Sequence, residues 1–200
     1  LIDPNNKNYA FDLIDRVGLP KKLFNKISLP GEYVGELTKE IQKEVGGNTK
    51  VILCASHDTA SAFESVEVSD DSIILSSGTW SLLGIKSKNP VISTKSFKAN
   101  YTNEGGINYI RFLKNIMGMW LINELRKEIN YTFDFLALNL PLVTYKETFD
   151  VNDESLLAPS SMKQAILDLL KVKPNNDLEL FASVYHSLAL CYKEAIEELE

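Results

Sequence analysis

The chain has 200 residues and a formal net charge of −6, from 21 Lys and Arg residues against 27 Asp and Glu residues. Hydrophobic residues make up 44% and charged residues 24%, ordinary values that exclude disordered, collagenous and low-complexity proteins. The acidic balance argues against a general nucleic-acid-binding protein, because such proteins carry a basic face. No apolar run approaches the ~18 residues of a membrane-spanning helix, and no secretory signal is evident. We therefore expect no nucleic-acid or membrane partner.

The cysteines indicate the cellular compartment, and the cysteines and histidines together bear on metal binding. Cys54 lies in an apolar run and Cys191 in a run with helical periodicity. We expect both to be buried free thiols in a reducing compartment, which predicts a cytoplasmic protein. The two histidines, His57 and His186, have no zinc-like spacing, so we expect no metal site built from Cys and His.

In the first third of the chain, hydrophobic periodicity and capping residues predict short elements. The first helix should turn Phe11, Leu13, Ile14 and Val17 inward and end at Gly18. Thr38 is a suitable N-cap, and Gly46 a suitable C-cap, for the second helix. The predicted strand is mostly apolar, which is typical of a strand buried on both faces. The predicted elements are a helix over Tyr9–Val17, a turn at Leu29–Gly31, a helix over Lys39–Val45, a strand over Lys50–Ala55 and a helix over Asp58–Glu64.

The rest of the chain predicts a hairpin followed by strands and helices. A strand, a glycine-containing turn and a second strand form a hairpin pattern. Asn115 is a suitable N-cap for a long helix, and Ser160 or Ser161 for a later one. The predicted elements are strands over Ile73–Leu75 and Trp80–Ile85, a turn at Thr102–Gly106, a strand over Ile107–Leu113, a helix over Ile116–Ile129, a loop over Pro141–Pro159, a helix ending at Leu170 and a helix from Asp177 to Glu200.

A polar, acidic break at Ser69-Asp70-Asp71 separates the strand–helix part from the hairpin part. We place a domain boundary there, with residues 1–70 in one domain and 71–200 in a second. The last helix runs to Glu200 without a capping residue, and the first residue is Leu1 rather than Met. We expect the chain to be a piece of a longer protein.

The densest group of reactive side chains, Ala55–Ala60, follows a predicted strand and opens a predicted helix. Ligands of open α/β sheets bind beyond the carboxyl ends of strands, and a helix N-terminus offers free N–H groups. Asp58 could accept the proton of a hydroxyl there, as phosphoryl transfer requires. The plainer interpretation, favoured by the local sequence alone, is that Asp58 caps its own helix. Adjacent His57 would point away from it, so the two form no triad.

Two further groups carry weaker signals. The turn around Gly78 and Thr79 could present N–H groups and a hydroxyl to phosphate oxygens, although an ordinary hairpin turn is the commoner explanation. Asn115 and Trp120 have the plain interpretations of helix cap and core residue. The sequence contains neither a P-loop nor a nucleophile elbow.

These groups occur together in one order, and in that order the chain resembles the FGGY family of carbohydrate kinases. The resemblance implies an α/β chain of the ribonuclease-H-like (actin-like ATPase) fold that contains parts of two domains, the end of the first and the start of the second. In that fold ATP and sugar share the cleft between the domains. The matching stretches are Ala55–Ala62, Leu75–Leu82, Thr102–Gly106 and Leu113–Gly118.

The resemblance also implies roles on the sugar side. Asp58 would be the catalytic base toward the sugar hydroxyl. His57 and Thr59 would flank it as sugar contacts, and Asn115 would be a further sugar contact. The implied reaction is transfer of the γ-phosphoryl group of ATP, bound with Mg²⁺, to the 1-hydroxyl of L-rhamnulose.

On the nucleotide side, Thr79 would contact the phosphates of ATP. Asn123 matches a position near the nucleotide that is commonly Gln in the family, so its side chain has a shorter reach. The family's phosphate-binding hairpin would lie upstream of Leu1, and its glycine-rich adenine segment beyond Glu200. The isolated piece is therefore expected to be inactive.

Alternatives stay open. The His57-Asp58-Thr59 run and Thr79-Trp80 favour L-rhamnulose over xylulose or glycerol, but another ketose or pentulose remains a candidate acceptor. The chain could also be a non-catalytic actin-like module that binds a sugar, a nucleotide or a protein. In a third interpretation the motifs are only caps and turns. The expected partners are a small sugar and ATP, and the sequence does not decide the oligomeric state.

Overall fold

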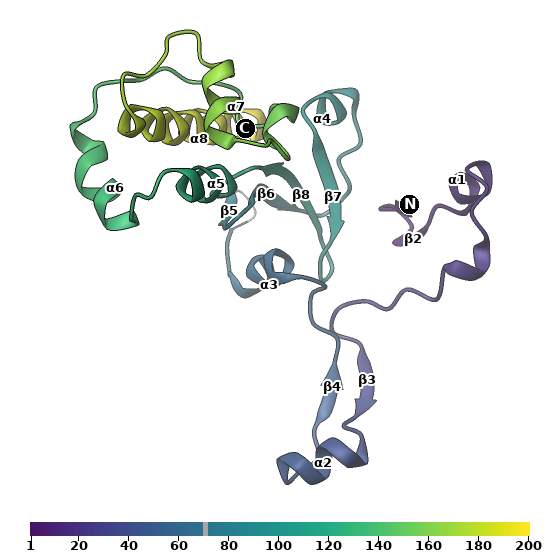
Figure 1. The fold of residues 1–200 in the computed structure, drawn as a ribbon. Helices are drawn as coiled ribbons and strands as arrows, with labels where there is room; N and C mark the ends of the chain where they lie inside the picture. The colour runs from purple at the N-terminus through teal and green to yellow at the C-terminus, as the bar shows by residue number, and fades with distance from the viewer. Residues whose placement is uncertain (70–71) are drawn as a thin grey trace. The chain divides into compact units, whose positions relative to one another are not determined.

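The computed structural model describes residues 1–69 and 72–200, so the predicted break at Asp70-Asp71 lies outside the described residues (Figure 1). The chain forms two compact units. The first unit comprises Leu1–Ser72 and Ile85–Leu113, and the second comprises Ile73–Gly84 and Lys114–Glu200. The division into domains at residue 70 stays a prediction.

The first unit begins with two antiparallel hairpins, each a sheet of two strands. The predicted turn at Leu29–Gly31 is present, because the Glu32 N–H donates to the Leu29 carbonyl at 3.2 Å. The elements are β1 (Ile2–Asp3), β2 (Asn8–Tyr9), α1 (Phe11–Arg16), a 3₁₀ turn η1 (Lys21–Leu23), β3 (Tyr33–Glu36), α2 (Lys39–Val45) and β4 (Lys50–Ile52).

Helix α2 confirms its predicted caps. The Thr38 hydroxyl accepts the N–H of Ile41, and Gly46 has a φ of 74°, in the left-handed region that ends helices. These interactions span only three or four residues of chain, so the local sequence suffices to specify them.

Two predictions for this part are wrong. Strand β4 is not buried on both faces: it pairs only with β3 in a two-stranded sheet, and Ile52 is 51% exposed. A two-stranded sheet lacks the covering layers that a fully buried strand needs. Helix α1 is shorter than Tyr9–Val17, and Leu13 and Val17 are exposed, whereas Ile14 is buried as predicted.

The first unit also contains helices α3 (Asp58–Ser65) and α4 (Thr94–Lys98) and strand β7 (Tyr101–Gly105). The turn predicted at Thr102–Gly106 is wrong, because the first four of these residues lie in β7, an edge strand. An edge strand tolerates polar side chains that a central strand would not. The chain turns after it, where the Gly106 N–H donates to the Tyr109 carbonyl at 3.0 Å.

A four-stranded sheet has the order β5-β6-β8-β7. Strand β5 (Ile74–Ser77) pairs antiparallel with β6 (Ser81–Ser87), and Ser77 lies opposite Ser81, which confirms the predicted hairpin. Strand β8 (Ile110–Ile116) extends three residues beyond the predicted end at Leu113. Strands β6 and β8 each contribute residues to both units.

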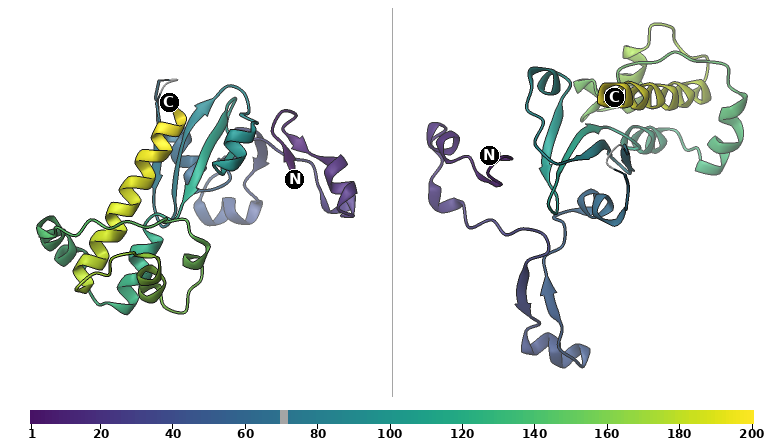
Figure 2. Two further views of the ribbon diagram at one scale, coloured as in Figure 1. Left: turned by 90° about the horizontal axis from the view of Figure 1, so that it is seen from above. Right: turned by 180° about the vertical axis from the view of Figure 1, so that it is seen from behind.

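The second unit holds the helices. Their shared core is apolar and includes Leu125, Ile166 and Phe181, each fully buried. Figure 2 shows α8 as the long yellow helix, and both α7 and α8 pack against α5. The elements are α5 (Trp120–Glu128), α6 (Phe133–Asn139), η2 (Leu140–Leu142), η3 (Glu154–Leu156), α7 (Met162–Leu169) and α8 (Asp177–Leu199).

Of the N-caps predicted for these helices, one at Ser161 is confirmed and the one at Asn115 is wrong. The Ser161 hydroxyl accepts the Gln164 N–H at the start of α7, as one of the two predicted alternatives. Asn115 caps no helix: it lies exposed in β8, and Met119 is the N-cap residue of α5. The strand continues through Asn115 because its neighbour Ile116 is fully buried in the core of the second unit.

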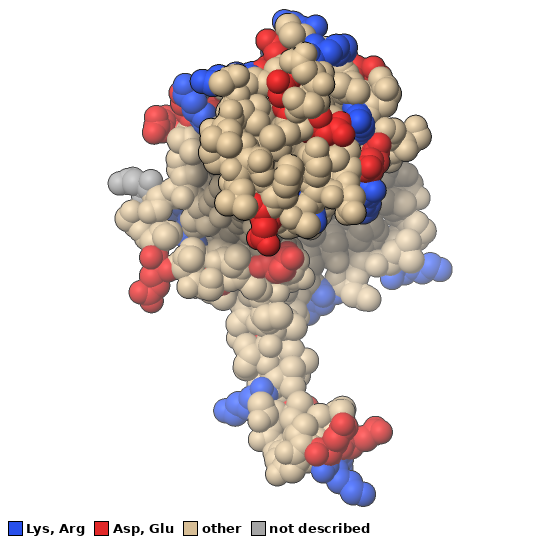
Figure 3. All heavy atoms as spheres, turned by 60° about the vertical axis from the view of Figure 1, so that its left-hand side comes forward, with Lys and Arg blue, Asp and Glu red and all other residues tan. Residues whose placement is uncertain are grey.

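Charged side chains of both signs are interspersed over the face drawn in Figure 3. On this face, acidic and basic side chains are mixed rather than gathered into one patch of a single sign.

Candidate active site

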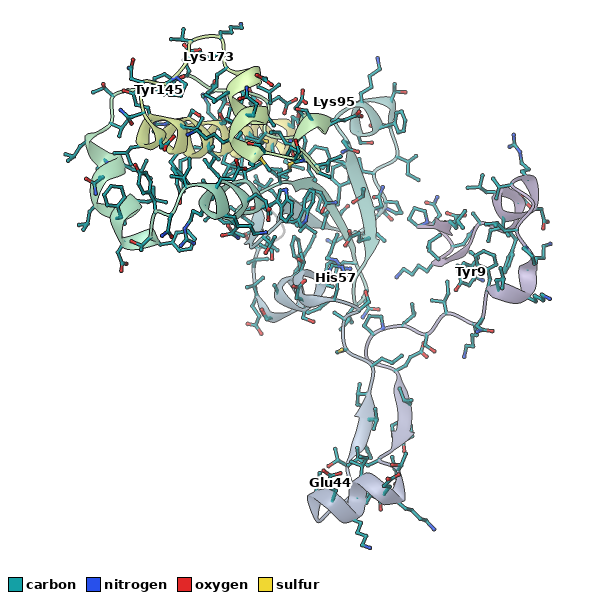
Figure 4. The ribbon with its side chains drawn as sticks, viewed as in Figure 1. Tyr9, Glu44, His57, Lys95, Tyr145 and Lys173 are labelled. Atoms are coloured by element: carbon teal, nitrogen blue, oxygen red, sulfur yellow. The ribbon has the colours of Figure 1, made fainter. Side chains whose placement is uncertain are left out.

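Helix α3 presents Asp58 at its N-terminus, next to His57, which is labelled in Figure 4. His57 is the N-cap: its Nδ1 atom accepts the Ala60 N–H at 3.4 Å. The interpretation of Asp58 as the cap is therefore wrong. Asp58 is the first helical residue, and its Oδ1 atom accepts the Thr59 N–H at 2.6 Å.

The Asp58 side chain is 100% exposed, so its carboxylate is open to a ligand. A carboxylate is stabilised at a helix N-terminus, where the backbone N–H groups carry partial positive charge. Thr59 differs, since it is only 8% exposed and its hydroxyl lies 3.5 Å from the Asp58 Oδ1 atom. Ala60 and Phe63, both fully buried, anchor the helix beneath these residues. The predicted roles of His57, Asp58 and Thr59 in catalysis and sugar binding stay predictions.

A chain of charged groups continues from His57 into the first unit. Its Nε2 atom lies 3.4 Å from Oε2 of Glu104 in β7. The same Glu104 oxygen is 3.5 Å from Nη2 of Arg111 in β8, and Nη1 of Arg111 is 3.9 Å from Oε1 of Glu64 in α3. Arg111 is 2% exposed. Glu104 lies in one of the motifs that resemble the family but has no predicted role, and Arg111 lies outside the predicted site. The sequence signal for Arg111 is its position as a charged residue inside the apolar run Ile110–Leu113.

A cavity of about 670 Å³ opens beside His57 within the first unit. Glu104 and Arg111 line it, together with Cys54. Its volume is within the range of small-molecule pockets, roughly 300–1,000 Å³. The other lining residues are Ile2, Pro4, Lys7, Ile27, Ser28, Leu29, Pro30, Leu53, Ala55, Ser56, Asn103, Gly105, Gly106 and Ile110.

The cysteine prediction is wrong for one of the two thiols. Cys54 is exposed, because it follows the exposed strand β4, whereas Cys191 is half-buried in α8. Burial raises the pKa of the Cys191 thiol above its ordinary value.

In the second unit, the β5–β6 turn is tied to the start of α5. The Trp120 N–H donates to the Thr79 carbonyl at 2.8 Å, and the Met119 N–H donates to the Gly78 carbonyl at 3.2 Å. Thr79 itself is exposed. Asn123 lies one turn further along α5, with its N–H bonded to the Met119 carbonyl. The structure thus brings the Thr79 turn to the beginning of the helix that carries Asn123.

Within the described residues, no group of three or more His, Cys, Asp and Glu side chains is arranged to hold a metal ion. Mg²⁺ typically keeps several waters and binds through one or two carboxylates together with substrate phosphates. That mode of binding needs no dedicated cluster of protein ligands. Residues 1–69 and 72–200 contain no helix with the length and apolar character that crossing a bilayer requires.

Residues 73–200 match the model of the FGGY family of carbohydrate kinases, C-terminal domain. The chain belongs to the FGGY family of carbohydrate kinases. This FGGY chain is 40% identical to the rhamnulokinase of Halalkalibacterium halodurans and 38% identical to that of Oceanobacillus iheyensis. Both alignments cover 100% of the chain and 44% of the relative, so the chain spans less than half the length of these curated relatives.

Solved structures of two kinases share the fold of this FGGY chain. The ligand-bound xylulose kinase from Lactobacillus acidophilus superimposes with a TM-score of 0.72 at 18% identity, over 99% of this chain and 42% of the other. The gluconate kinase from the same organism gives a TM-score of 0.71 at 17% identity, with the same coverage. These matches confirm the predicted α/β, ribonuclease-H-like (actin-like ATPase) fold.

Proposed function

We propose that this FGGY chain is part of an ATP-dependent kinase that transfers the γ-phosphoryl group of ATP to the 1-hydroxyl of L-rhamnulose. The choice of sugar is supported by relatives named rhamnulokinase that are 38% and 40% identical over the whole chain. The structural neighbours support the fold alone, because their identities are below 20%.

The observation that carries the proposal is the exposed Asp58 carboxylate at the first position of α3. In phosphoryl transfer the acceptor hydroxyl must be oriented toward the γ-phosphorus, and a carboxylate does this by accepting its hydrogen bond. Asp58 would hold the 1-hydroxyl of the ketose and receive its proton as the new O–P bond forms and the bond from the γ-phosphorus to the departing ADP breaks. The transferred group is loosely bonded in the transition state, so this proton moves late.

On the nucleotide side we place ATP phosphates against the Thr79 turn, whose carbonyl groups are held by the N-terminus of α5. The exposed Thr79 hydroxyl would donate to a phosphate oxygen. Mg²⁺ bound to ATP would neutralise charge on the phosphates. Asn123 would approach the nucleotide from the same helix, and Asn115 would contact the sugar.

We place the reaction in the cytoplasm. The cytoplasm supplies the ATP that a kinase needs. An exposed thiol such as Cys54 also stays reduced there, because the compartment is reducing.

The decisive experiment uses the full-length protein and its Asp58→Asn variant. Asparagine keeps the size of the side chain but cannot accept the proton, so we expect kcat to fall about 10²-fold or more while calorimetry still detects sugar and ATP binding. Wild-type protein should phosphorylate L-rhamnulose in preference to D-xylulose, D-gluconate and glycerol. Near-normal turnover by the variant would remove Asp58 from the role of base.

A further inference from the structure

Both ring nitrogens of His57 face groups of the protein. Nδ1 accepts the Ala60 N–H at 3.4 Å, and Nε2 lies 3.4 Å from Oε2 of Glu104. A ring nitrogen that accepts a hydrogen bond carries no proton, so the proton of the neutral imidazole must be on Nε2. A proton on Nε2 lies beside the Glu104 carboxylate, so each ring nitrogen already has a protein group 3.4 Å away. Nδ1 also lies 3.8 Å from Oδ1 of Asp58.

Glu104 is itself held in place. Its Oε2 atom is 3.5 Å from Nη2 of Arg111, whose side chain is 3% exposed. Within the described part of the chain, Nε and Nη1 of Arg111 have no hydrogen-bond partner. A buried guanidinium needs nearby carboxylates to offset its lost hydration, and Glu104 and Glu64 are the two at hand. Moving Glu104 away from Arg111 would therefore be costly.

The His57 ring fixes the start of helix α3, because its Nδ1 atom accepts the Ala60 N–H. An N-cap side chain fixes where the helix begins by binding the N–H of a residue two or three positions later. Asp58 is the first residue after that cap, and its carboxylate is bonded to the next N–H, that of Thr59. A change in the cap thus shifts the backbone that carries the Asp58 carboxylate.

We propose that Glu104 is a positioning residue for phosphoryl transfer. Held by Arg111, it fixes the His57 ring with its proton on Nε2, so that Nδ1 caps α3 and the Asp58 carboxylate stays aimed at the acceptor hydroxyl. His57 then acts through the helix and not through a hydrogen bond to the sugar, contrary to the sugar contact that the family resemblance implies. The catalytic part of this proposal rests on the proposed kinase function.

The first test needs no activity. In full-length protein with ¹⁵N-labelled histidine, two-bond ¹H–¹⁵N spectra report which ring nitrogen carries the proton, and the His57→Asn variant assigns the signal. We expect the Nε2–H form in the wild type and a mixture of forms in Glu104→Ala. A proton on Nδ1 in the wild type, or spectra that Glu104→Ala leaves unchanged, would overturn the proposal.

The second test separates positioning from sugar contact. Misplacing a catalytic group by about 1 Å costs up to ~10²-fold, so Glu104→Ala and His57→Ala should each lower kcat by about tenfold to 10²-fold. The KM for the sugar should stay within about twofold, because no hydrogen bond to the sugar is removed. In His57→Asn the amide oxygen can still cap the helix, so kcat should be largely restored.

Two further variants complete this design. The double variant Glu104→Ala/His57→Ala should lose no more activity than either single variant, because the two residues act as one unit. Exposed Glu67 provides the matched control, and Glu67→Ala should leave both constants unchanged. A raised sugar KM with unchanged kcat in both His57 variants would overturn the positioning role. Failure of wild-type protein to phosphorylate any ketose would refute the proposed function instead, and the spectra would still decide the His57 geometry.

Discussion

The hydroxyl groups of Ser81 and Tyr192 lie 2.7 Å apart and join residues separated by 111 positions in the chain. Ser81 is fully buried in β6, two residues after Thr79, and Tyr192 lies in α8. Gly118 completes this contact, since a Cβ atom at that position would be 2.6 Å from the Ser81 hydroxyl oxygen. The turn proposed to bind phosphate is therefore supported from beneath by helix α8 and by the segment before α5.

Gly118→Ala should weaken this support. The added methyl group collides with Ser81, and the φ of +57° at position 118 disfavours any residue with a Cβ atom. We expect a loss of about 1–3 kcal/mol in the free energy of unfolding, measured by urea denaturation of the full-length protein. The KM for ATP should also rise. Gly47→Ala is the matched control, because nothing lies within 4 Å of its Cβ position; equal effects of the two substitutions would contradict the collision.

Glu128 should make the stability of the second unit depend on pH. Its carboxylate, in the last turn of α5, accepts the Ser161 hydroxyl and the Met162 N–H at 2.6 Å each, and the Lys163 N–H at 3.2 Å. Burial favours the neutral carboxyl, but these hydrogen bonds outweigh it and hold the pKa of Glu128 below its ordinary value of 4.5. A pKa that is lower in the folded state stabilises the fold above the unfolded pKa, and this stabilisation disappears as the pH falls through the folded pKa.

Glu128→Gln should therefore cost about 1 kcal/mol of unfolding free energy at pH 7. The difference between variant and wild type should shrink as the pH is lowered past 4.5 toward 3, as followed by urea unfolding at each pH. Glu197→Gln serves as control, because the Glu197–Lys193 pair is exposed and should contribute little. A difference that does not change with pH would contradict the role assigned to the Glu128 carboxylate.

The two thiols should react at different rates. Cys54 is exposed, whereas burial raises the pKa of Cys191 and its Sγ atom accepts the Asn152 amide N–H at 3.5 Å. Because the thiolate is the reactive form, iodoacetamide at pH 8 should label Cys54 well before Cys191. Peptide mass spectrometry of native full-length protein measures both rates. Cys54→Ser should leave the slow phase unchanged, and equal labelling rates would refute the prediction.

Asn123→Gln tests the nucleotide side of the site. The substitution adds one methylene group and extends the amide from α5, next to the helix start that holds Thr79. If Asn123 faces ATP, the longer side chain should lower the KM for ATP a few-fold, while the KM for the sugar stays the same. Steady-state kinetics on the full-length protein gives both constants. Asn130→Gln, at an exposed position after α5, is the control, and an unchanged KM for ATP would remove Asn123 from the nucleotide site.

Local interactions account for the elements that the sequence predicted well. The caps Thr38 and Ser161 bind N–H groups three residues ahead, and the β5–β6 hairpin closes within a few residues. Such interactions need no knowledge of the rest of the molecule. The motifs with Asp58 and Thr79 were also recognisable, because family resemblance resides in their order along the chain.

Pairings between distant segments decided the rest. Whether Lys50–Ile52 is buried depends on what packs over it, and whether Thr102–Gly106 is a turn depends on the neighbouring strand. The same holds for His57, whose ring faces Glu104, a residue 47 positions away in another element. Residue order alone determined the family and the short-range caps of this protein. Tertiary structure decided burial and the charged contacts around His57, because the energies of both depend on groups that only folding brings together.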